Sequence, residues 1–148
     1  MATSPDPLDP ADLAARFRQA LMPLVRQLRT NVEEGMTPGL MSALATVARQ
    51  GPIALGDLAA VERISPPMAT KTAAALEARG LVERQPCADD KRVVRLALRP
   101  EGRALLDRSH ARRNSWLAQR IDELPESERA ALAEAIDVIE HLNREVGG

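Results

Sequence analysis

Residues 81–102, which read LVERQPCADDKRVVRLALRPEG, decide the fold. Two short aliphatic runs, Leu81–Arg84 and Val93–Leu98, have the composition of strands. The segment between them, Gln85–Arg92, is polar and contains a proline and two aspartates, which favour a turn. The stretch therefore predicts a β-hairpin, and Pro100 behind it predicts the start of a helix.

Three helical segments precede the hairpin. Thr37 and Ser65 each stand before a proline, which is typical of an N-cap followed by the first helical turn. Gly51 and Gly80 stand where a glycine commonly ends a helix. The predicted boundaries are 38–50, 55–63 and 66–79, with a short extended piece at 52–54.

Apolar residues recur at three- and four-residue spacings in these segments, as they do on the buried side of a helix. The order helix, extended piece, helix, turn, helix, strand, loop, strand predicts a winged helix-turn-helix, in which one helix positions a second in the major groove of DNA. The expected core comprises Leu40, Leu44, Val47, Ala48, Leu58, Ala59, Ala69, Ala73 and Leu76.

Longer helices are expected on both sides of this head. The first carries an apolar stripe with arginines off the stripe, and Pro23 inside it predicts a kink. A long helix starts at Pro100, and Pro125 suits the first turn of a last helix. The stripes have no other obvious burial, so they predict a dimer interface. The residues predicted for the interface are Leu13, Phe17, Leu21 and Leu24 in the first helix and Ile136, Ile139 and Leu142 in the last. The stripes also include Ala20 and Leu28 in the first helix and Leu132 and Val146 in the last.

Composition excludes several classes of function. The chain of 148 residues has the size of one domain, with 45% hydrophobic and 28% charged residues. Aromatic residues make up 1%, which argues against a stacking platform for single-stranded nucleic acid. One cysteine allows no intramolecular disulfide, and the two histidines form no metal motif. We found no membrane span, signal peptide, enzyme motif or cofactor fingerprint, and expect a cytoplasmic protein without cofactor or metal.

Charge is unevenly distributed along a chain whose formal net charge is −1. Residues 60–103 contain nine basic and six acidic side chains, whereas residues 104–148 contain six basic and nine acidic ones. A basic segment beside an acidic one suits a protein that presents one face to a polyanion. Two ordinary solvated faces would give the same small offset.

The hairpin also carries a family signature. Asp90 and Arg92, then five residues, then Leu98 and Gly102 resemble the wing signature D-x-R-x5-L-T-x-x-G of the MarR family, with Arg99 in place of the threonine. Residues 57–84 resemble the reading head of that family, and the likeness extends from about residue 8 to 146. It implies a mainly α-helical fold with a small β-hairpin wing. One MarR-like domain would span residues 1–148, with its head at about 37–99 and dimerisation helices at about 9–34 and 100–146.

The resemblance implies a homodimeric, sequence-specific transcription regulator. Its two winged heads would bind a pseudo-palindromic operator in double-stranded DNA. Many members are repressors released by a small, often aromatic or anionic, effector or by an oxidant. Two alternatives stay open: a winged-helix DNA-binding protein without ligand response, and a winged-helix module that contacts proteins.

The predicted third helix supplies most candidate base contacts. Ser65 lies at its N-terminus, where free backbone N–H groups favour a phosphate, although a plain N-cap is the alternative. Met68 and Thr70 could contact a thymine methyl or a base edge, and Lys71 a guanine edge or a phosphate. Pro67 shares their outward side, opposite Ala69 and Ala73; a merely solvated face is the alternative.

The wing supplies the remaining candidates. Arg92 suits a narrow minor groove, and an internal ion pair with Asp90 is its alternative role. We expect Asp90 to orient that arginine or to tie down the loop, because a carboxylate would repel phosphate. Lys91 and Arg84 are further candidate phosphate contacts.

Other singled-out residues have weaker signals. Cys87 lies near two aspartates that should oppose thiolate formation, so we expect an ordinary loop thiol rather than a redox switch. Phe17 and Trp116 either line an effector pocket or pack in the core or an interface. Ala54 and Arg99 stand where a capping Thr or Ser is expected, and a missing cap costs about 1 kcal/mol.

Overall fold

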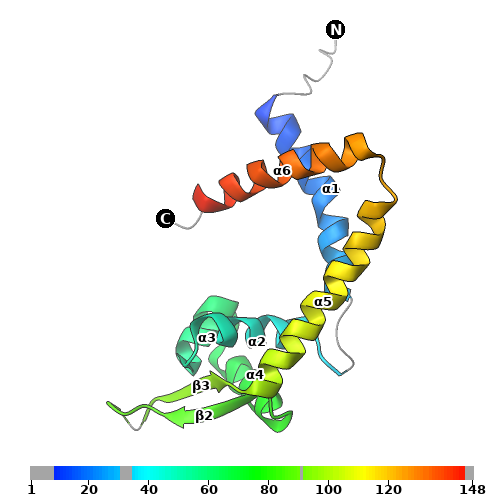
Figure 1. The fold of residues 1–148 in the computed structure, drawn as a ribbon. Coiled ribbons are helices and arrows are strands. Elements are labelled where there is room, and N and C mark those ends of the chain that lie inside the picture. Colours follow the sequence, from blue (N-terminus) through cyan, green and yellow to red (C-terminus); the bar gives the residue numbers. More distant parts are fainter. Residues whose placement is uncertain (1–8, 31–34, 91, 146–148) are drawn as a thin grey trace. The chain divides into compact units, whose positions relative to one another are not determined.

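The computed structural model describes residues 9–30, 35–90 and 92–145. These residues form six helices and a three-stranded antiparallel sheet (Figure 1). The chain forms two compact units, which divide between His110 and Ala111. The elements are α1 (Pro10–Thr30), α2 (Pro38–Gln50), β1 (Ile53–Ala54), α3 (Leu55–Glu62), α4 (Pro66–Ala78), β2 (Val82–Pro86), β3 (Val94–Leu98), α5 (Pro100–Asp122) and α6 (Glu126–Glu145).

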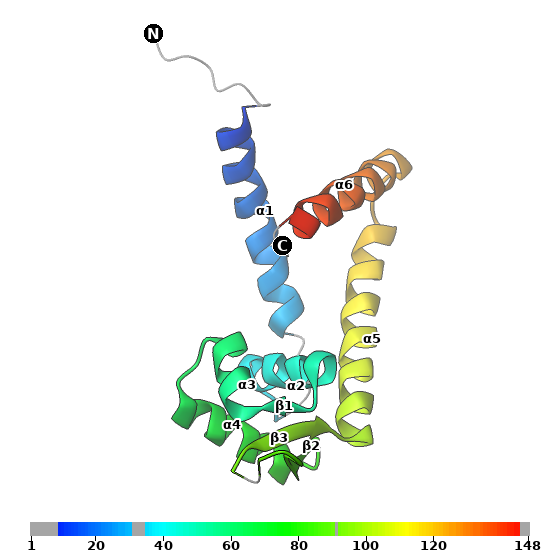
Figure 2. The same ribbon diagram turned by 90° about the vertical axis from the view of Figure 1, so that its left-hand side faces the viewer.

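The head consists of α2, α3, α4 and the sheet, which share one hydrophobic core. Figure 2 shows the strands along one side of the three helices. Each element contributes a side chain to the centre: Leu44 from α2, Leu58 from α3, Leu76 from α4 and Leu96 from β3 are all fully buried. Complete burial of four leucines supplies several kcal/mol of hydrophobic stabilisation, at about 2 kcal/mol for each side chain. The predicted helical core of the head is confirmed at Leu44, Val47, Leu58, Ala59, Ala69, Ala73 and Leu76, whereas Leu40 and Ala48 are only partly buried.

The sheet order is β1-β3-β2, with both pairs antiparallel. Val82 pairs with Leu98 and Pro86 with Val94, so β2 runs two residues further than the strand predicted from the sequence. Proline lacks the N–H that a central strand needs, but β2 lies at the sheet edge and tolerates it. The turn that was expected to begin at Gln85 therefore begins after Pro86.

The helix caps agree largely with the sequence. The Thr37 hydroxyl accepts the Leu40 N–H at 3.2 Å and the Ser65 hydroxyl accepts the Met68 N–H at 3.3 Å. Ala54 occupies the N-cap of α3 without a side-chain bond, as expected for alanine. Gly51 differs from the prediction, because its φ of −71° is open to any residue. Glycine is needed there for space, since a Cβ would collide with the carbonyl oxygen of Val47.

A polar link joins α2 to α3. The hydroxyl of fully buried Thr46 donates to Glu62 Oε1 at 2.5 Å, and Arg49 Nη2 donates to the same hydroxyl at 3.0 Å. A buried hydroxyl without a partner would cost roughly 1–3 kcal/mol, so Glu62 satisfies a group that the packing of α2 places inside. The link holds α3 against α2 one residue before the turn that leads to α4.

The outer helices expose their apolar stripes. Helix α1 runs through Pro23 without interruption and has no buried residue. Helix α6 begins after Pro125, one residue later than expected, and exposes Ile136 and Leu142. The burial predicted for these stripes is therefore not achieved within one chain; Val146 lies outside the described residues. Only the first half of α5 contributes buried residues, which are Gly102, Leu105, Leu106 and Ser109.

Candidate nucleic-acid interface

Helix α4 has one buried and one solvent-exposed side. Ala69, Ala73 and Leu76 are fully buried. The candidate contacts on its other sides are exposed, and Met68 has 47% of its surface accessible. The described exposed candidates on this helix and its cap are Ser65, Pro67, Met68, Thr70 and Lys71.

The hydroxyl groups of Ser65 and Thr70 already form hydrogen bonds with the backbone of α4. Ser65 Oγ caps α4, so a phosphate contact by this residue would share the oxygen that accepts the Met68 N–H. Thr70 Oγ1 donates to the Pro66 carbonyl at 3.1 Å, which leaves its methyl group and one oxygen face for a base.

The turn before α4 contains Arg63 in the left-handed conformation (φ 53°), which the sequence did not indicate.

The wing loop is held by backbone hydrogen bonds around Asp90. The Asp90 carboxylate accepts the Arg92 N–H at 2.9 Å, and its carbonyl accepts the Val93 N–H at 3.0 Å. Cys87 N–H donates to the Val93 carbonyl and closes the loop. Of the two roles expected for Asp90, this geometry corresponds to tying down the loop. Across the described residues, no ion pair joins its carboxylate to the exposed Arg92 guanidinium, and Lys91 lies outside them.

Arg84 on β2 forms an ion pair with helix α4. Its Nε donates to Glu77 Oε2 on α4 at 2.9 Å. Glu77 was not among the predicted site residues, although it is the one acidic residue in α4. Arg84 thus has a protein partner in the place where a phosphate contact was expected.

The environment of Cys87 corrects the sequence-based expectation. Hydrogen bonds from the backbone N–H groups of Asp90 and Asp89 lower the pKa of its thiol, and the positive charge of Arg95 adds to the effect. The aspartate carboxylates were expected to oppose the thiolate. The prediction was wrong because the backbone amides of these residues, rather than their side chains, contact the sulfur.

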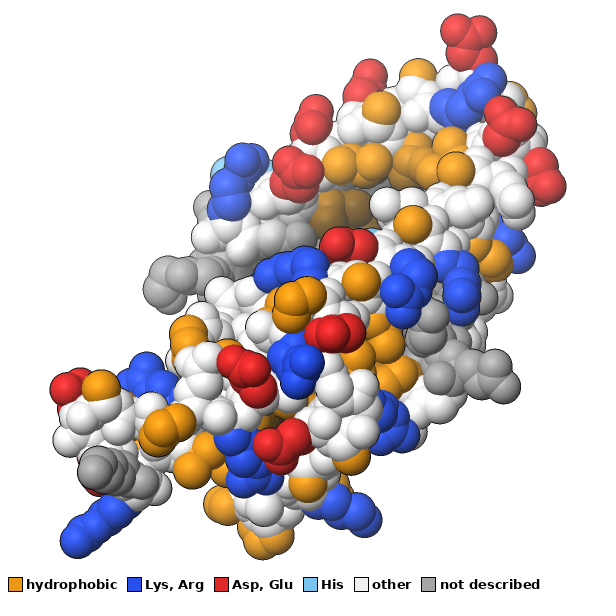
Figure 3. Space-filling model, turned by 60° about the horizontal axis from the view of Figure 1, so that its bottom comes forward, with side chains coloured by type: hydrophobic (Ala, Val, Ile, Leu, Met, Phe, Trp, Pro, Cys, Tyr) orange, Lys and Arg blue, Asp and Glu red, His pale blue; other side chains and the backbone are white. Residues whose placement is uncertain are grey.

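The face of the head that carries α4 and the wing is chemically mixed. In Figure 3, which brings the lower part of the molecule forward, Lys and Arg side chains alternate with acidic and apolar ones. Such a surface neutralises fewer phosphates than a uniformly basic one. No cluster of His, Cys, Asp and Glu suited to a metal occurs among the residues that the structure describes, and none of their helices meets the length and apolarity of a membrane span.

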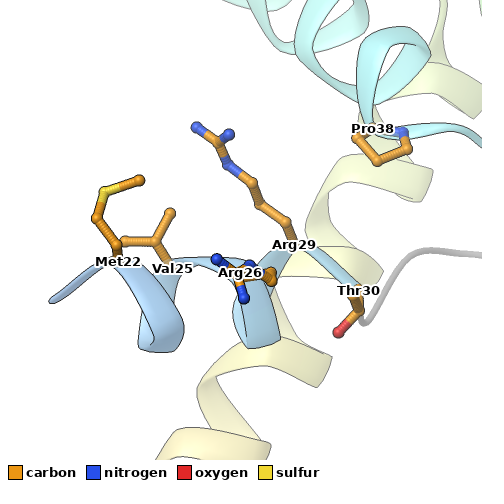
Figure 4. Close-up of a pocket in the computed structure, with 6 residues that line it drawn as sticks. All are labelled: Met22, Val25, Arg26, Arg29, Thr30 and Pro38. Atoms are coloured by element: carbon orange, nitrogen blue, oxygen red, sulfur yellow. The ribbon is translucent and has the colours of Figure 1, made fainter. Parts of the chain in front are cut away.

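A pocket of about 320 Å³ lies between α1 and the start of α2 (Figure 4). Its lining combines aliphatic side chains with Arg26 and Arg29, two of the arginines that lie off the apolar stripe of α1. Phe17 and Trp116 are not among its lining residues, and the Arg120 guanidinium lies 3.6 Å from the centroid of the Trp116 ring. The lining residues are Met22, Val25, Arg26, Arg29, Thr30 and Pro38.

These features define a winged helix-turn-helix protein of the DNA-binding class. Residues 36–94 match the family model described as "MarR family". A protein of Mycobacterium tuberculosis named as an HTH-type transcriptional regulator is 37% identical over 130 residues, which cover 87% of this chain and 91% of the relative. The HTH-type transcriptional repressor MdtR of Bacillus subtilis is 28% identical over 127 residues, covering 81% and 82% of the two chains.

A solved structure shows the same fold. A mutant of MepR from S. aureus, bound to an oligodeoxyribonucleotide, aligns with a TM-score of 0.69 at 18% identity over 88% of this chain and 97% of that one. The chain belongs to the MarR family of helix-turn-helix transcription regulators. The family and the named relatives are regulators of transcription rather than enzymes.

Proposed function

We propose that this regulator is a cytoplasmic, homodimeric repressor that binds a pseudo-palindromic operator through two winged heads. The observation that carries the proposal is the exposed side of α4 beside the wing on one packed head. In winged helix-turn-helix proteins such a helix enters the major groove, and a dimer contacts two half-sites. The repressor name of the Bacillus subtilis relative supports the sign of the regulation.

The candidate residues divide into reading and anchoring groups. Pro67, Met68 and Thr70 are proposed to distinguish bases, because apolar and small side chains contact thymine methyl groups and base edges. Ser65 and Lys71 are proposed to bind phosphates or, for Lys71, a guanine edge. This division makes base discrimination a property of α4, which we call the recognition helix.

The wing is proposed to anchor the head. Arg92 and Lys91 would deliver positive charge to the minor groove or the adjacent backbone. The backbone bonds that hold the loop around Asp90 support this role for Arg92, because they fix the position from which the guanidinium extends. A phosphate contact by Arg84 would be opposed by the carboxylate of Glu77, with which it forms an ion pair.

The homodimer is supported by the exposed apolar residues of the outer helices. Among the described residues, α1 exposes Leu13, Phe17 and Met22, and α6 exposes Ile136, Val138 and Leu142. Val138, at 59% accessible, is the most exposed of these six. Apolar stripes on two helices are typical of surfaces that a second subunit covers.

We further propose that binding of a small-molecule effector releases the regulator from DNA. The sequence leaves Phe17 and Trp116 open as pocket-lining or packing residues, and the pocket with Arg26 and Arg29 offers a location for an anionic, partly apolar compound. On α5, the buried Ser109 hydroxyl is without a hydrogen-bond partner in the described residues.

A mobility-shift experiment tests the central claim. Duplex DNA from upstream of its own gene and an unrelated duplex of equal length are titrated in parallel. The proposal requires tighter binding to the upstream DNA at physiological salt. Equal affinity for both duplexes would favour a DNA-binding protein that does not recognise a specific sequence in the upstream DNA. Binding to neither duplex would favour the alternative of a winged-helix module that contacts proteins.

A further inference from the structure

The ion pair between Glu77 and Arg84 joins the recognition helix to the first strand of the wing. Arg84 Nε lies 2.9 Å from Glu77 Oε2, and the two side chains are 35% and 42% exposed. The pair therefore lies at the surface, between the two elements that are proposed to enter neighbouring grooves of DNA. It is the one ion pair that links these two elements among the described residues.

The strand geometry explains why Arg84 meets the helix. Side chains alternate along a strand, so Arg84 shares its face of β2 with Val82. Val82 is buried, which turns this face toward the helical layer. On the helix, Glu77 follows Leu76 of the core and thus lies at the edge of the buried side.

The pair contributes little to folding. Partly exposed ion pairs contribute about 0–1 kcal/mol, because water screens them and two long side chains must be ordered. Its consequence for DNA binding is larger, because the negative charge of Glu77 offsets the positive charge that Arg84 presents to a phosphate. A phosphate that approaches Arg84 therefore meets the Glu77 carboxylate beside it, whether the carboxylate stays paired with Nε or is displaced.

We propose that Glu77 masks Arg84 and thereby limits the sequence-independent affinity of the head for DNA. Phosphate contacts strengthen binding to every sequence, whereas discrimination comes from base contacts and DNA shape. Because competing sites outnumber an operator by many orders of magnitude, one fewer neutralised phosphate per head lowers the fraction of protein that is held on unrelated DNA. Glu77 thus sets the sequence-independent affinity of the head without contacting a base. The inference rests on the proposed DNA binding by the head.

The test measures affinity across a salt series on an unrelated duplex and on the upstream DNA. Each neutralised phosphate contributes about 0.9 to the slope of log affinity against log salt, so Glu77→Gln should steepen it by roughly two units for a dimer. As a single substitution, Arg84→Ala should leave the slope unchanged. In the double variant, which carries both Glu77→Gln and Arg84→Ala, most of the steepening caused by Glu77→Gln should be absent.

Glu83→Gln is the matched control for a general charge effect. It removes one negative charge six residues further along the chain, on β2, where the Glu83 carboxylate accepts from the Gln85 amide at 2.9 Å rather than from an arginine. It should steepen the slope much less than Glu77→Gln. Glu77→Ala serves as a second variant, and circular dichroism checks that each variant retains its helices.

Two results would overturn the masking proposal while DNA binding stands. A shallower slope for Arg84→Ala alone would show that Arg84 contacts phosphate in the presence of Glu77. An equal gain from Glu83→Gln, or a gain that persists in the double variant, would show that any lost acid has the same effect. Failure of the unmodified protein to bind either duplex would instead overturn the proposed function.

Discussion

Ala54 leaves the N-terminus of α3 without a side-chain cap, and its backbone already has the extended conformation that a capping residue needs (φ −69°, ψ 149°). Ala54→Thr should therefore raise the free energy of unfolding by about 1 kcal/mol, through a hydrogen bond to a free N–H of the first turn. Urea denaturation measures the change. Arg99→Thr should raise the free energy of unfolding by less, because Glu101 already accepts a hydrogen bond from a backbone N–H of the first turn of α5. This bond, from its own N–H, is the main cause that lowers the pKa of the Glu101 carboxylate, and Arg99 lowers it further. An unchanged midpoint for Ala54→Thr would contradict the assigned boundary.

Gly102 matches the glycine of the wing signature, and the structure gives its physical reason. A Cβ at this position would collide with the Leu81 carbonyl oxygen and lie 2.8 Å from Leu98 Cδ1. Gly102→Ala should therefore lower the free energy of unfolding by about 1–3 kcal/mol, the usual cost of overpacking. Gly56→Ala in α3 is the matched control, since nothing lies within 4 Å of its Cβ, and it should stabilise by about 0.5–1 kcal/mol. Similar effects of the two substitutions on the denaturation midpoint would refute this explanation.

The thiol of Cys87 should react at lower pH than an ordinary cysteine. Backbone N–H groups of Asp90 and Asp89 and the charge of Arg95 favour the thiolate and lower the pKa. The thiolate is the reacting form, so the midpoint of the rate of alkylation against pH should shift downward. In denaturing urea, where these contacts are lost, the midpoint should return upward. A folded-state midpoint at or above the denatured one would show that the wing loop does not hold these bonds in solution.

At the scale of elements, local signals predicted the head well. Thr37 and Ser65 act as caps through their own first turns, so neighbouring residues sufficed to find them. The end of β2 was missed because tolerance of Pro86 depends on the edge position, which follows from β1 pairing on the far side of β3. The Glu77–Arg84 pair was missed for a similar reason, since it joins two elements across seven residues.

The recognition helix and the wing should make different contributions to DNA binding. Arg92→Ala should weaken binding to operator and unrelated DNA alike, and should reduce the salt slope by roughly two units for a dimer. Met68→Ala should leave the slope unchanged and cost about 1 kcal/mol per half-site on the operator alone. Affinities of both variants across a salt series on both duplexes provide the measurement. Loss confined to the operator for Arg92→Ala, or equal losses on both DNAs for Met68→Ala, would reverse the assigned roles.

For the whole molecule, the central question is what covers the apolar sides of α1 and α6. The sequence predicted their stripes correctly, but periodicity indicates only that a side is apolar. It does not indicate whether the same chain or another one buries it. In the described part of the chain, no residue of α1 is buried, so its apolar stripe remains at least partly exposed to solvent. A second subunit is the proposed cover.

The last prediction therefore tests the dimer through both outer helices. Leu13→Glu on α1 and Leu142→Glu on α6 place a charge on side chains that are 47% and 52% exposed in the single chain, so neither should unfold the head. Buried in an interface, each unpaired charge would cost several kcal/mol, and sedimentation at micromolar concentration should shift toward monomer. Val61→Glu on α3, at a side chain 43% exposed, is the matched control and should leave the dimer intact. Because a monomer carries one head, the two outer-helix variants should also lose about half of the salt slope on DNA. A dimer that survives both substitutions with its slope unchanged would show that these stripes are not the interface.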